Sequence, residues 1–184
     1  MNAATDATAV AMRTAMPHDA PRIAAIYAHH VRTGLASFEI EPPDAAEIAR
    51  RLAEVRAQGL PFLVAEADGH VVGYAYATPY RSRPAYRYTL EDSVYVDQGC
   101  AGRGIGRRLL ARLVSEAAAC GHRQMIAVIG DSANRPSIAL HAACGFVRVG
   151  LLPAVGRKFG RWVDSVLMQR SLGAGDAPLP AGGE

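Results

Sequence analysis

The sequence predicts a single α/β domain in which a hairpin-rich first half is followed by alternating strands and helices. The chain has 184 residues, of which 50% are apolar and 20% are charged, as expected for one globular domain with a sizeable core. In the first half, two β-rich runs flank the dipeptide Asp68-Gly69, which favours a tight hairpin turn. In the second half, apolar runs of strand length alternate with segments that carry the apolar spacing of helices.

Before the hairpin, the sequence predicts one short strand and two helices. Residues 10–16 are the strand candidate, and Asp19 can cap the first helix. The segment "EPPDAAEIARRLAEVRAQG" begins with the helix-start signal Pro-Pro-Asp and ends at Gly59, a typical helix stop. We therefore expect both helices to precede the hairpin in the chain.

The remaining elements follow in a regular order. The hairpin strands are expected at 62–66 and 71–80, and the run "TLEDSVYV" predicts the next strand. A glycine-rich turn then opens a helix that reaches about residue 120, and the apolar strand "QMIAVIG" follows. The helix "PSIALHAACGF" precedes two last strands, near 146–155 and 161–171.

Both ends of the chain lack the apolar residues that packing requires. Residues 1–9 are small and polar, and "GAGDAPLPAGGE" is rich in glycine, proline and alanine. We therefore expect one domain at 10–172, with disordered tails at 1–9 and 173–184.

Charge and cysteine content argue against several classes of protein. The net charge is +3, and the basic residues, of which only Lys158 is lysine, are spread along the chain, so no nucleic-acid or membrane partner is expected. The three cysteines form no CxxC pair, which favours reduced thiols over disulfides or a metal site. The first residues do not resemble a signal peptide, and no apolar run could span a bilayer. We expect a cytoplasmic protein without a metal.

The stretch "QGCAGRGIGRRLL" has the composition of a phosphate-binding turn. A P-loop requires Lys-Ser or Lys-Thr after its last glycine, but Arg107 and Arg108 follow Gly106. A dinucleotide fingerprint has the spacing G-x-G-x-x-G, whereas Gly102, Gly104 and Gly106 give G-x-G-x-G. Both classes are therefore excluded.

A strand that leads into a glycine turn at a helix start can still hold a pyrophosphate. The missing Cβ atoms let backbone N–H groups approach closely, and the helix dipole favours negative charge. Arg103 and Arg107 can add charge-assisted contacts. Taken alone, the glycines fit a plain tight turn equally well.

Together with "VYVDQGCAGRGIGRRLL", the segment from Asn134 to Phe146 resembles the GCN5-related N-acetyltransferase (GNAT) superfamily. Its motif [Q/R]-x-x-G-x-[G/A], which binds the pyrophosphate of acetyl-CoA, is matched at Gly104 and Gly106, while Ala101 departs from it. The resemblance implies a mixed central sheet of about seven strands with flanking helices, and acetyl-CoA as acetyl donor. The cofactor-binding residues that it implies are Val94, Tyr95, Val96, Gly102, Arg103, Gly104, Ile105, Gly106, Arg107 and Asn134.

Four further stretches are similar to the phosphinothricin and methionine sulfoximine N-acetyltransferases: "IAAIYAHHVRTGLASFEIEPP", "YRYTLEDSVYV", "NRPSIALHAACGF" and "GRKFGRWVDSVLMQRSL". This resemblance implies direct transfer of acetyl, in a ternary complex, to the α-amine of a small amino-acid-like acceptor, and a homodimer whose contact includes the segment around Trp162. Two alternatives stay open. One is another acceptor, such as an ordinary amino acid, a polyamine, an aminoglycoside or a protein N-terminus, and the other is an acyl-CoA-binding module without turnover.

Acyl transfer to an amine requires a base, donors for the oxyanion and a proton for the departing thiolate. Glu91 matches the glutamate of the group's "TLE" pattern and is the expected base, directly or through a water, with Asp92 as the rival. A backbone N–H near Val94 could polarise the thioester carbonyl. His141 lies where much of the superfamily has a tyrosine that is proposed to protonate the thiolate, and an imidazole suits that role.

The segment "YRSRPAYRYTLE" places arginine and tyrosine residues just before Glu91. Guanidinium groups bind carboxylate, phosphinate or sulfoximine oxygens with paired hydrogen bonds. The substrate-contacting loop of the resembled group falls on this segment, and Phe38 in "ASFE" resembles a lid residue. The expected substrate-binding residues are therefore Phe38, Arg81, Arg83, Tyr88 and Thr89.

Overall fold

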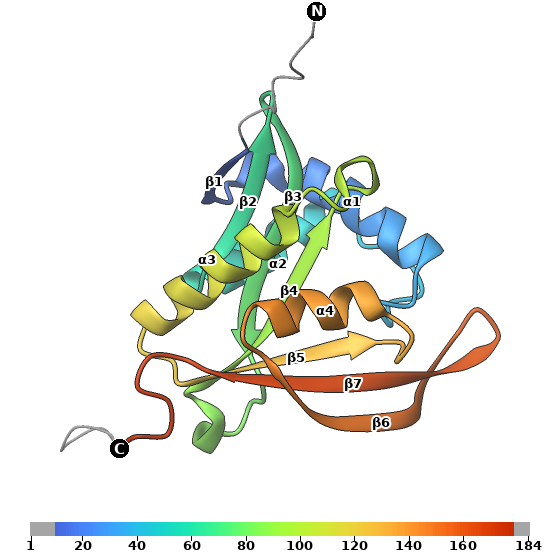
Figure 1. Ribbon diagram of the computed structural model, residues 1–184. Coiled ribbons are helices and arrows are strands. Elements are labelled where there is room, and N and C mark those ends of the chain that lie inside the picture. The colour runs from blue at the N-terminus through green and yellow to red at the C-terminus, as the bar shows by residue number, and fades with distance from the viewer. Residues whose placement is uncertain (1–9, 179–184) are drawn as a thin grey trace, which may run out of the picture.

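A mixed sheet of seven strands forms the centre of the protein, and four α-helices cover its two faces (Figure 1). These counts refer to residues 10–178, the part of the chain that the computed structural model describes. The strand order is β1-β2-β3-β4-β5-β7-β6, and all neighbouring strands are antiparallel except β4 and β5, which are parallel. The predicted α/β class with a mixed seven-stranded sheet is confirmed.

The first half of the chain follows the predicted order: β1 (Ala11–Thr14), α1 (Ala20–Thr33), α2 (Ala45–Ala57), β2 (Phe62–Ala67) and β3 (His70–Pro79). Asp68 and Gly69 turn the β2–β3 hairpin with φ angles of 50° and 74°. Asp44 caps α2 by accepting a hydrogen bond from the Glu47 amide. The predicted capping role of Asp19 is wrong, because its buried carboxylate binds Arg13 and the Met16 amide instead.

The second half contains β4 (Thr89–Val96), α3 (Ile105–Ala119), β5 (Gln124–Gly130), α4 (Arg135–Ala143), β6 (Val147–Lys158) and β7 (Arg161–Ser171). Three short 3-10 helices, η1 (Pro17–Asp19), η2 (Pro84–Tyr86) and η3 (Gln98–Cys100), lie in the connections. The strand "TLEDSVYV" and the strand "QMIAVIG" have the bounds that the sequence predicts.

The domain bounds and the two expected tails stay predictions. Residues 1–9 and 179–184 lie outside the described part of the chain, so the expectation for them is not tested. Residues 173–176, at the start of the second tail, lie in turns. The Gly175 amide donates to the Leu172 carbonyl, and Arg123 donates to the Gly175 carbonyl. These hydrogen bonds hold the start of the predicted tail against the end of β7.

The two faces of the sheet bury different side chains. Tyr74 and Tyr95 stack on one face and meet Tyr27 of α1 edge to face. On the other face, a Cβ added at Gly73 would lie 3.2 Å from Leu109 of α3, so this glycine allows α3 to pack closely on β3. In Figure 1, α3 and α4 lie in front of the sheet while α1 and α2 lie behind it.

The parallel pairing of β4 and β5 stops halfway along both strands. It covers four residue pairs, from Thr89 and Gln124 to Asp92 and Ala127. Beyond these pairs β4 continues to Val96 and β5 to Gly130, and each strand pairs only with its other neighbour. The sheet therefore opens between the carboxyl ends of two strands, a position where α/β folds commonly bind ligands.

Candidate active site

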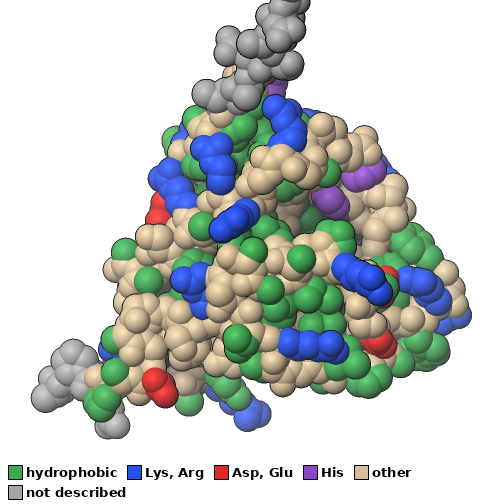
Figure 2. Space-filling model, viewed as in Figure 1, with side chains coloured by type: hydrophobic (Ala, Val, Ile, Leu, Met, Phe, Trp, Pro, Cys, Tyr) green, Lys and Arg blue, Asp and Glu red, His purple; other side chains and the backbone are tan. Residues whose placement is uncertain are grey.

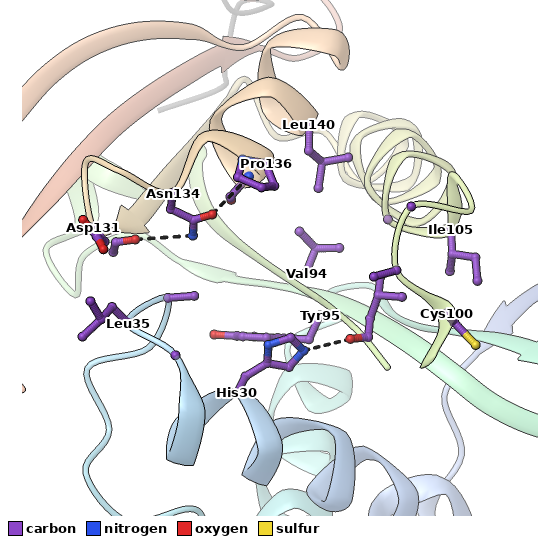
Figure 3. A pocket seen from close by; sticks show the side chains of 18 of the residues that line it. His30, Leu35, Val94, Tyr95, Cys100, Ile105, Asp131, Asn134, Pro136 and Leu140 are labelled. Atoms are coloured by element: carbon purple, nitrogen blue, oxygen red, sulfur yellow. Dashed lines mark hydrogen bonds between the residues drawn. The ribbon is translucent and has the colours of Figure 1, made fainter. Parts of the chain in front are cut away.

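A groove of about 770 Å³ lies at the opening between β4 and β5. The end of β4, the glycine-rich turn with the start of α3, the start of α4 and the end of α1 enclose it (Figure 3). All the predicted cofactor-binding residues except Arg103 line this groove, namely Val94, Tyr95, Val96, Gly102, Gly104, Ile105, Gly106, Arg107 and Asn134. Arg103 is exposed, and its guanidinium lies 3.8 Å from the Cys100 sulfur.

The hydrogen-bond phase of β4 directs particular backbone groups into the groove. In an antiparallel pair, alternate residues bond to the partner strand and the others point away. The Tyr80 amide bonds to the Thr89 carbonyl, and the Asp97 amide bonds to the Val72 carbonyl. Residues of odd number in β4 therefore bond to β3, and the N–H and C=O groups of Val94 and Val96 point toward the opening.

The glycine-rich turn presents backbone rather than side chains to the groove. Gly102 and Gly104 both have φ angles of 75°, in the left-handed region that residues with a Cβ avoid. Gly104 is the N-cap of α3, and a Cβ at Gly106 would meet the Leu140 side chain at 3.4 Å. The first residues of a 15-residue helix with one buried face thus line the groove, an arrangement that favours negatively charged groups.

Asn134 combines a structural and a groove-lining position. Its side-chain oxygen accepts a hydrogen bond from the Ser137 amide at the start of α4, and its amide group donates to the Gly130 carbonyl at 3.4 Å. It lines the groove and a second cavity beside it. The interpretations of this residue as helix cap and as ligand contact are therefore compatible.

Sequence reasoning missed residues that reach the groove from α1. The His30 side chain donates through Nε2 to the Val96 carbonyl at 2.8 Å, and burial lowers the pKa of this imidazole. Leu35 and Ala36, just after the helix, line the opposite wall. His30 and Val96 are 66 positions apart, so no local pattern could have predicted the contact.

The second cavity has a volume of about 230 Å³ and lies on the β4 side of the groove. Its wall contains Glu91 and His141, the two predicted catalytic residues, together with Asp92 and Phe38. Five residues line both spaces: Ala36, Val94, Tyr95, Asn134 and Ser137. The structure therefore brings the predicted base, the predicted acid and the β4 backbone to one place where two ligands could meet.

The Glu91 side chain lies on the α1 side of β4, where its surroundings favour the protonated, neutral form of the carboxyl group. Burial raises the pKa of its carboxyl group; the positive charge of Arg81 opposes this rise, and the negative charge of Asp92 adds to it. A carboxyl group with a raised pKa is better matched to proton transfer near neutral pH than an ordinary one.

His141 and Asp92 form a buried pair on the opposite face of β4. The His141 Nε2 atom lies 3.1 Å from the Asp92 carboxylate, and Nδ1 lies 2.7 Å from the Ser137 carbonyl. Because the carboxylate and the carbonyl are acceptors, the geometry favours a proton on each ring nitrogen, that is, an imidazolium. Burial alone would lower the pKa of His141, but the hydrogen bond and the charge of Asp92 and the Ser137 carbonyl raise it above its usual value.

The predicted substrate-binding residues are only partly brought together. Phe38 lines the second cavity and is 37% exposed. Arg81, Arg83, Tyr88 and Thr89 do not line either space in the described part of the chain. They lie around η2 at the start of β4, where the Arg81 guanidinium stacks on the Tyr80 ring at 4.4 Å and Arg87 on Tyr88 at 4.8 Å.

Two further searches of residues 10–178 concern other kinds of site. No three His, Cys, Asp or Glu side chains there are arranged to hold a metal ion. No helix in the same range has the length and apolar content needed to cross a bilayer.

The fold and the groove are those of an acetyltransferase. The chain belongs to the acetyltransferase (GNAT) family, whose model matches residues 23–146, and it is accordingly an N-acetyltransferase. It is 58% identical over 172 residues to a phosphinothricin N-acetyltransferase from Alcaligenes faecalis, covering 94% of this chain and 87% of the relative.

Two further relatives agree with this assignment. An L-methionine sulfoximine/L-methionine sulfone acetyltransferase from Salmonella typhimurium is 42% identical, over 91% of this chain and 97% of its own. Among solved structures, a phosphinothricin acetyltransferase from Sinorhizobium meliloti in complex with acetyl-CoA superposes with a TM-score of 0.90 at 46% identity. This match covers 95% of this chain and 94% of that one.

The buried pair leads to a testable statement about protonation. In ¹⁵N-labelled protein at about pH 7, both ring nitrogens of His141 should carry a proton, because each faces an acceptor. Substitution Asp92→Asn removes the negative charge, so the NMR titration midpoint of His141 should fall by about 1 to 3 pH units. Asp19→Asn is a matched control, since it also changes a buried, hydrogen-bonded carboxylate, and it should leave this midpoint in place. One protonated ring nitrogen in the unchanged protein, or equal midpoints in both variants, would contradict the assignment.

Proposed function

We propose that this protein transfers the acetyl group of acetyl-CoA to the α-amine of a small acidic amino-acid analogue of the phosphinothricin or methionine sulfoximine type. The transfer is direct, with both ligands bound. The observation that carries the proposal is the meeting of two cavities at Val94, with Glu91 and His141 in the wall of the smaller one. The names of the relatives support this acceptor class.

The groove fits acetyl-CoA as donor. The Val94 carbonyl and the Val96 N–H, which face the opening, bind the amides of the pantetheine arm as an additional strand would. The N-terminal amides of α3 and the glycine turn hold the pyrophosphate, and Arg103 and Arg107 add positive charge. Ala101 has no side-chain donor, so only backbone N–H groups bind the pyrophosphate at this position.

Glu91 serves as the base. It accepts the proton of the acceptor ammonium, directly or through a water, and the freed amine attacks the carbonyl carbon of the thioester. Its rival, Asp92, is 7% exposed and bonded to His141, which supports Glu91 for this role. The raised pKa of Glu91 brings its proton affinity closer to that of the group it must deprotonate.

Acyl transfer also requires a donor for the oxyanion and a proton for the thiolate, and Val94 and His141 are assigned to these roles. The Val94 N–H stabilises the oxyanion, a contribution that is typically about 3 kcal/mol for a single donor. When the carbon–sulfur bond breaks, the His141 imidazolium gives its Nε2 proton to the thiolate, and the neutral ring later regains a proton from solvent. The nitrogen of the new amide loses its second proton to solvent, and Glu91 later releases the first one there. His141 must release Asp92 in this step, since the two are bonded in the protein as it stands.

Acceptor binding is assigned to Phe38 in the smaller cavity and to the segment before β4. Arg81 influences the Glu91 carboxyl electrostatically, which supports a position near the acceptor. Arg81 and Arg83, which lie outside both cavities, are assigned to the acidic groups of the acceptor, with Tyr88 and Thr89 beside them. This concentration of positive charge disfavours polyamines and aminoglycosides as acceptors.

We also assign the protein to the cytoplasm and to a homodimer formed through β6. This edge strand exposes apolar side chains on both faces, including neighbouring Leu151 and Leu152 at 40% and 44%. Val147, Val149, Val155 and Trp162 are between 53% and 66% exposed. An exposed apolar edge of this kind normally requires a partner, and a second copy of the chain provides one of matching character.

The function is tested with a thiol-release assay that uses acetyl-CoA and a panel of amines. Phosphinothricin, methionine sulfoximine and methionine sulfone should turn over, whereas spermidine, kanamycin and most free amino acids should not. Glu91→Gln should lower kcat by about 10²- to 10⁴-fold without changing the Kd for acetyl-CoA. Glu54→Gln, on the exposed face of α2, is the control. Binding of acetyl-CoA without turnover of any amine would favour the non-catalytic alternative.

The dimer is tested by light scattering after size-exclusion chromatography. The unchanged protein should have the mass of two chains, and Trp162→Glu should give a monomer because it places a charge in the apolar contact. Arg32→Glu, on the exposed side of α1, should remain dimeric. A monomeric unchanged protein would refute this assignment.

A further inference from the structure

The segment between α1 and α2 forms one wall of both cavities, and residues 34–39 are its relevant part. Leu35 faces the groove, Ala36 lines both spaces, and Ser37 and Phe38 face the smaller cavity. We refer to these six residues as the 34–39 loop. Its position therefore determines the shape of the space assigned to the acceptor.

Hydrogen bonds hold the 34–39 loop on both sides of Phe38. The Ser37 hydroxyl lies 2.7 Å from the Tyr27 hydroxyl, and its carbonyl accepts from the Lys158 ammonium at 2.7 Å. Glu39 accepts hydrogen bonds from Tyr27 at 3.1 Å and from Arg51 at 2.7 Å. Because the neighbours of Phe38 are fixed, its ring is the part of the loop that can move without breaking these bonds.

The β6–β7 hairpin also lies against the Phe38 ring. The register between β6 and β7 shifts between Leu152 and Gly156, and Ala154 has a φ angle of 51°, so β6 bends at this point. A Cβ added at Gly156 would overlap the Phe38 ring and would still be only 3.0 Å from its Cζ atom. The absence of a side chain at Gly156 is therefore what lets the Phe38 ring occupy its place.

We propose that Gly156 is a specificity-determining residue, because it sets the position of the Phe38 ring and thereby the shape of the acceptor cavity. It does so without contacting the acceptor itself. This inference rests on the proposed function, in that the smaller cavity is taken to hold the acceptor. It adds a second element, the β6–β7 hairpin, to the parts of the fold that determine which amine is acetylated.

Substitution Gly156→Ala tests the inference. The added methyl group displaces the Phe38 ring, so kcat/KM for the preferred acceptor should fall by about 10- to 200-fold, mainly through KM. The KM for acetyl-CoA should not change, because Gly156 does not line the groove. Gly150→Ala is the matched control on the same strand, where a Cβ would lie 3.6 Å from Leu167 in ordinary contact, and it should have no effect.

A double-substitution cycle separates a contact with Phe38 from a general disturbance of the hairpin. In a Phe38→Ala background the ring is gone, so adding Gly156→Ala should have no further effect on acceptor KM. If the two effects simply add, the inference is wrong. If Gly156→Ala alone does not fold but the double variant does, the contact is supported. If neither folds, the methyl group meets something other than Phe38 and the inference is overturned.

The unchanged enzyme separates this inference from the proposed function. If it acetylates no amine on the panel, the proposed function fails, and the position of the Phe38 ring is then read from a crystal structure of Gly156→Ala. An unmoved ring in that structure refutes the inference whatever the activity of the enzyme.

Discussion

Parallel strands are held together by a ladder of hydrogen bonds, and in this protein the ladder between β4 and β5 ends after four residue pairs. The proposed donor site depends on this interruption. It leaves the backbone groups of Val94 and Val96 directed at an opening, and it places the ends of both strands beside the first turns of α3 and α4. Helix N-termini and strand edges are the two backbone surfaces that bind anions and extended chains most readily, and here they share one groove.

The same strand also separates the proposed proton-transfer groups. Side chains alternate between the two faces of a strand, so consecutive Glu91 and Asp92 lie in different surroundings. Glu91 faces the α1 side, where burial favours its neutral form. Asp92 faces α4, where it is hydrogen-bonded to His141. Two adjacent carboxyl groups thus have different partners, because the alternation of side chains places them on opposite faces of one strand.

Local signals in the sequence predicted most of the elements, whereas the residues that line the groove were expected from the family resemblance. Asp68-Gly69 specifies its own turn, and the glycines before α3 need their positive φ angles wherever the chain lies. The His141–Asp92 pair and the contact of His30 with Val96 join residues 49 and 66 positions apart, and only tertiary packing creates them. Likewise, nothing in the sequence connects Gly156 with Phe38. The side chain of Asp19 was expected to cap α1, but the same carboxylate can instead form an ion pair with Arg13. Burial favours the ion pair.

Residue-resolved hydrogen exchange, measured by NMR with and without acetyl-CoA, tests the central claim that the open edge of β4 binds the donor. Ser93 and Tyr95, which bond to β3, should be protected in both samples. The Val94 and Val96 amides should exchange faster in the free protein and become protected when acetyl-CoA is added. If these two amides are already protected without acetyl-CoA, or stay unprotected in its presence, the donor does not bind along β4 and the account is wrong.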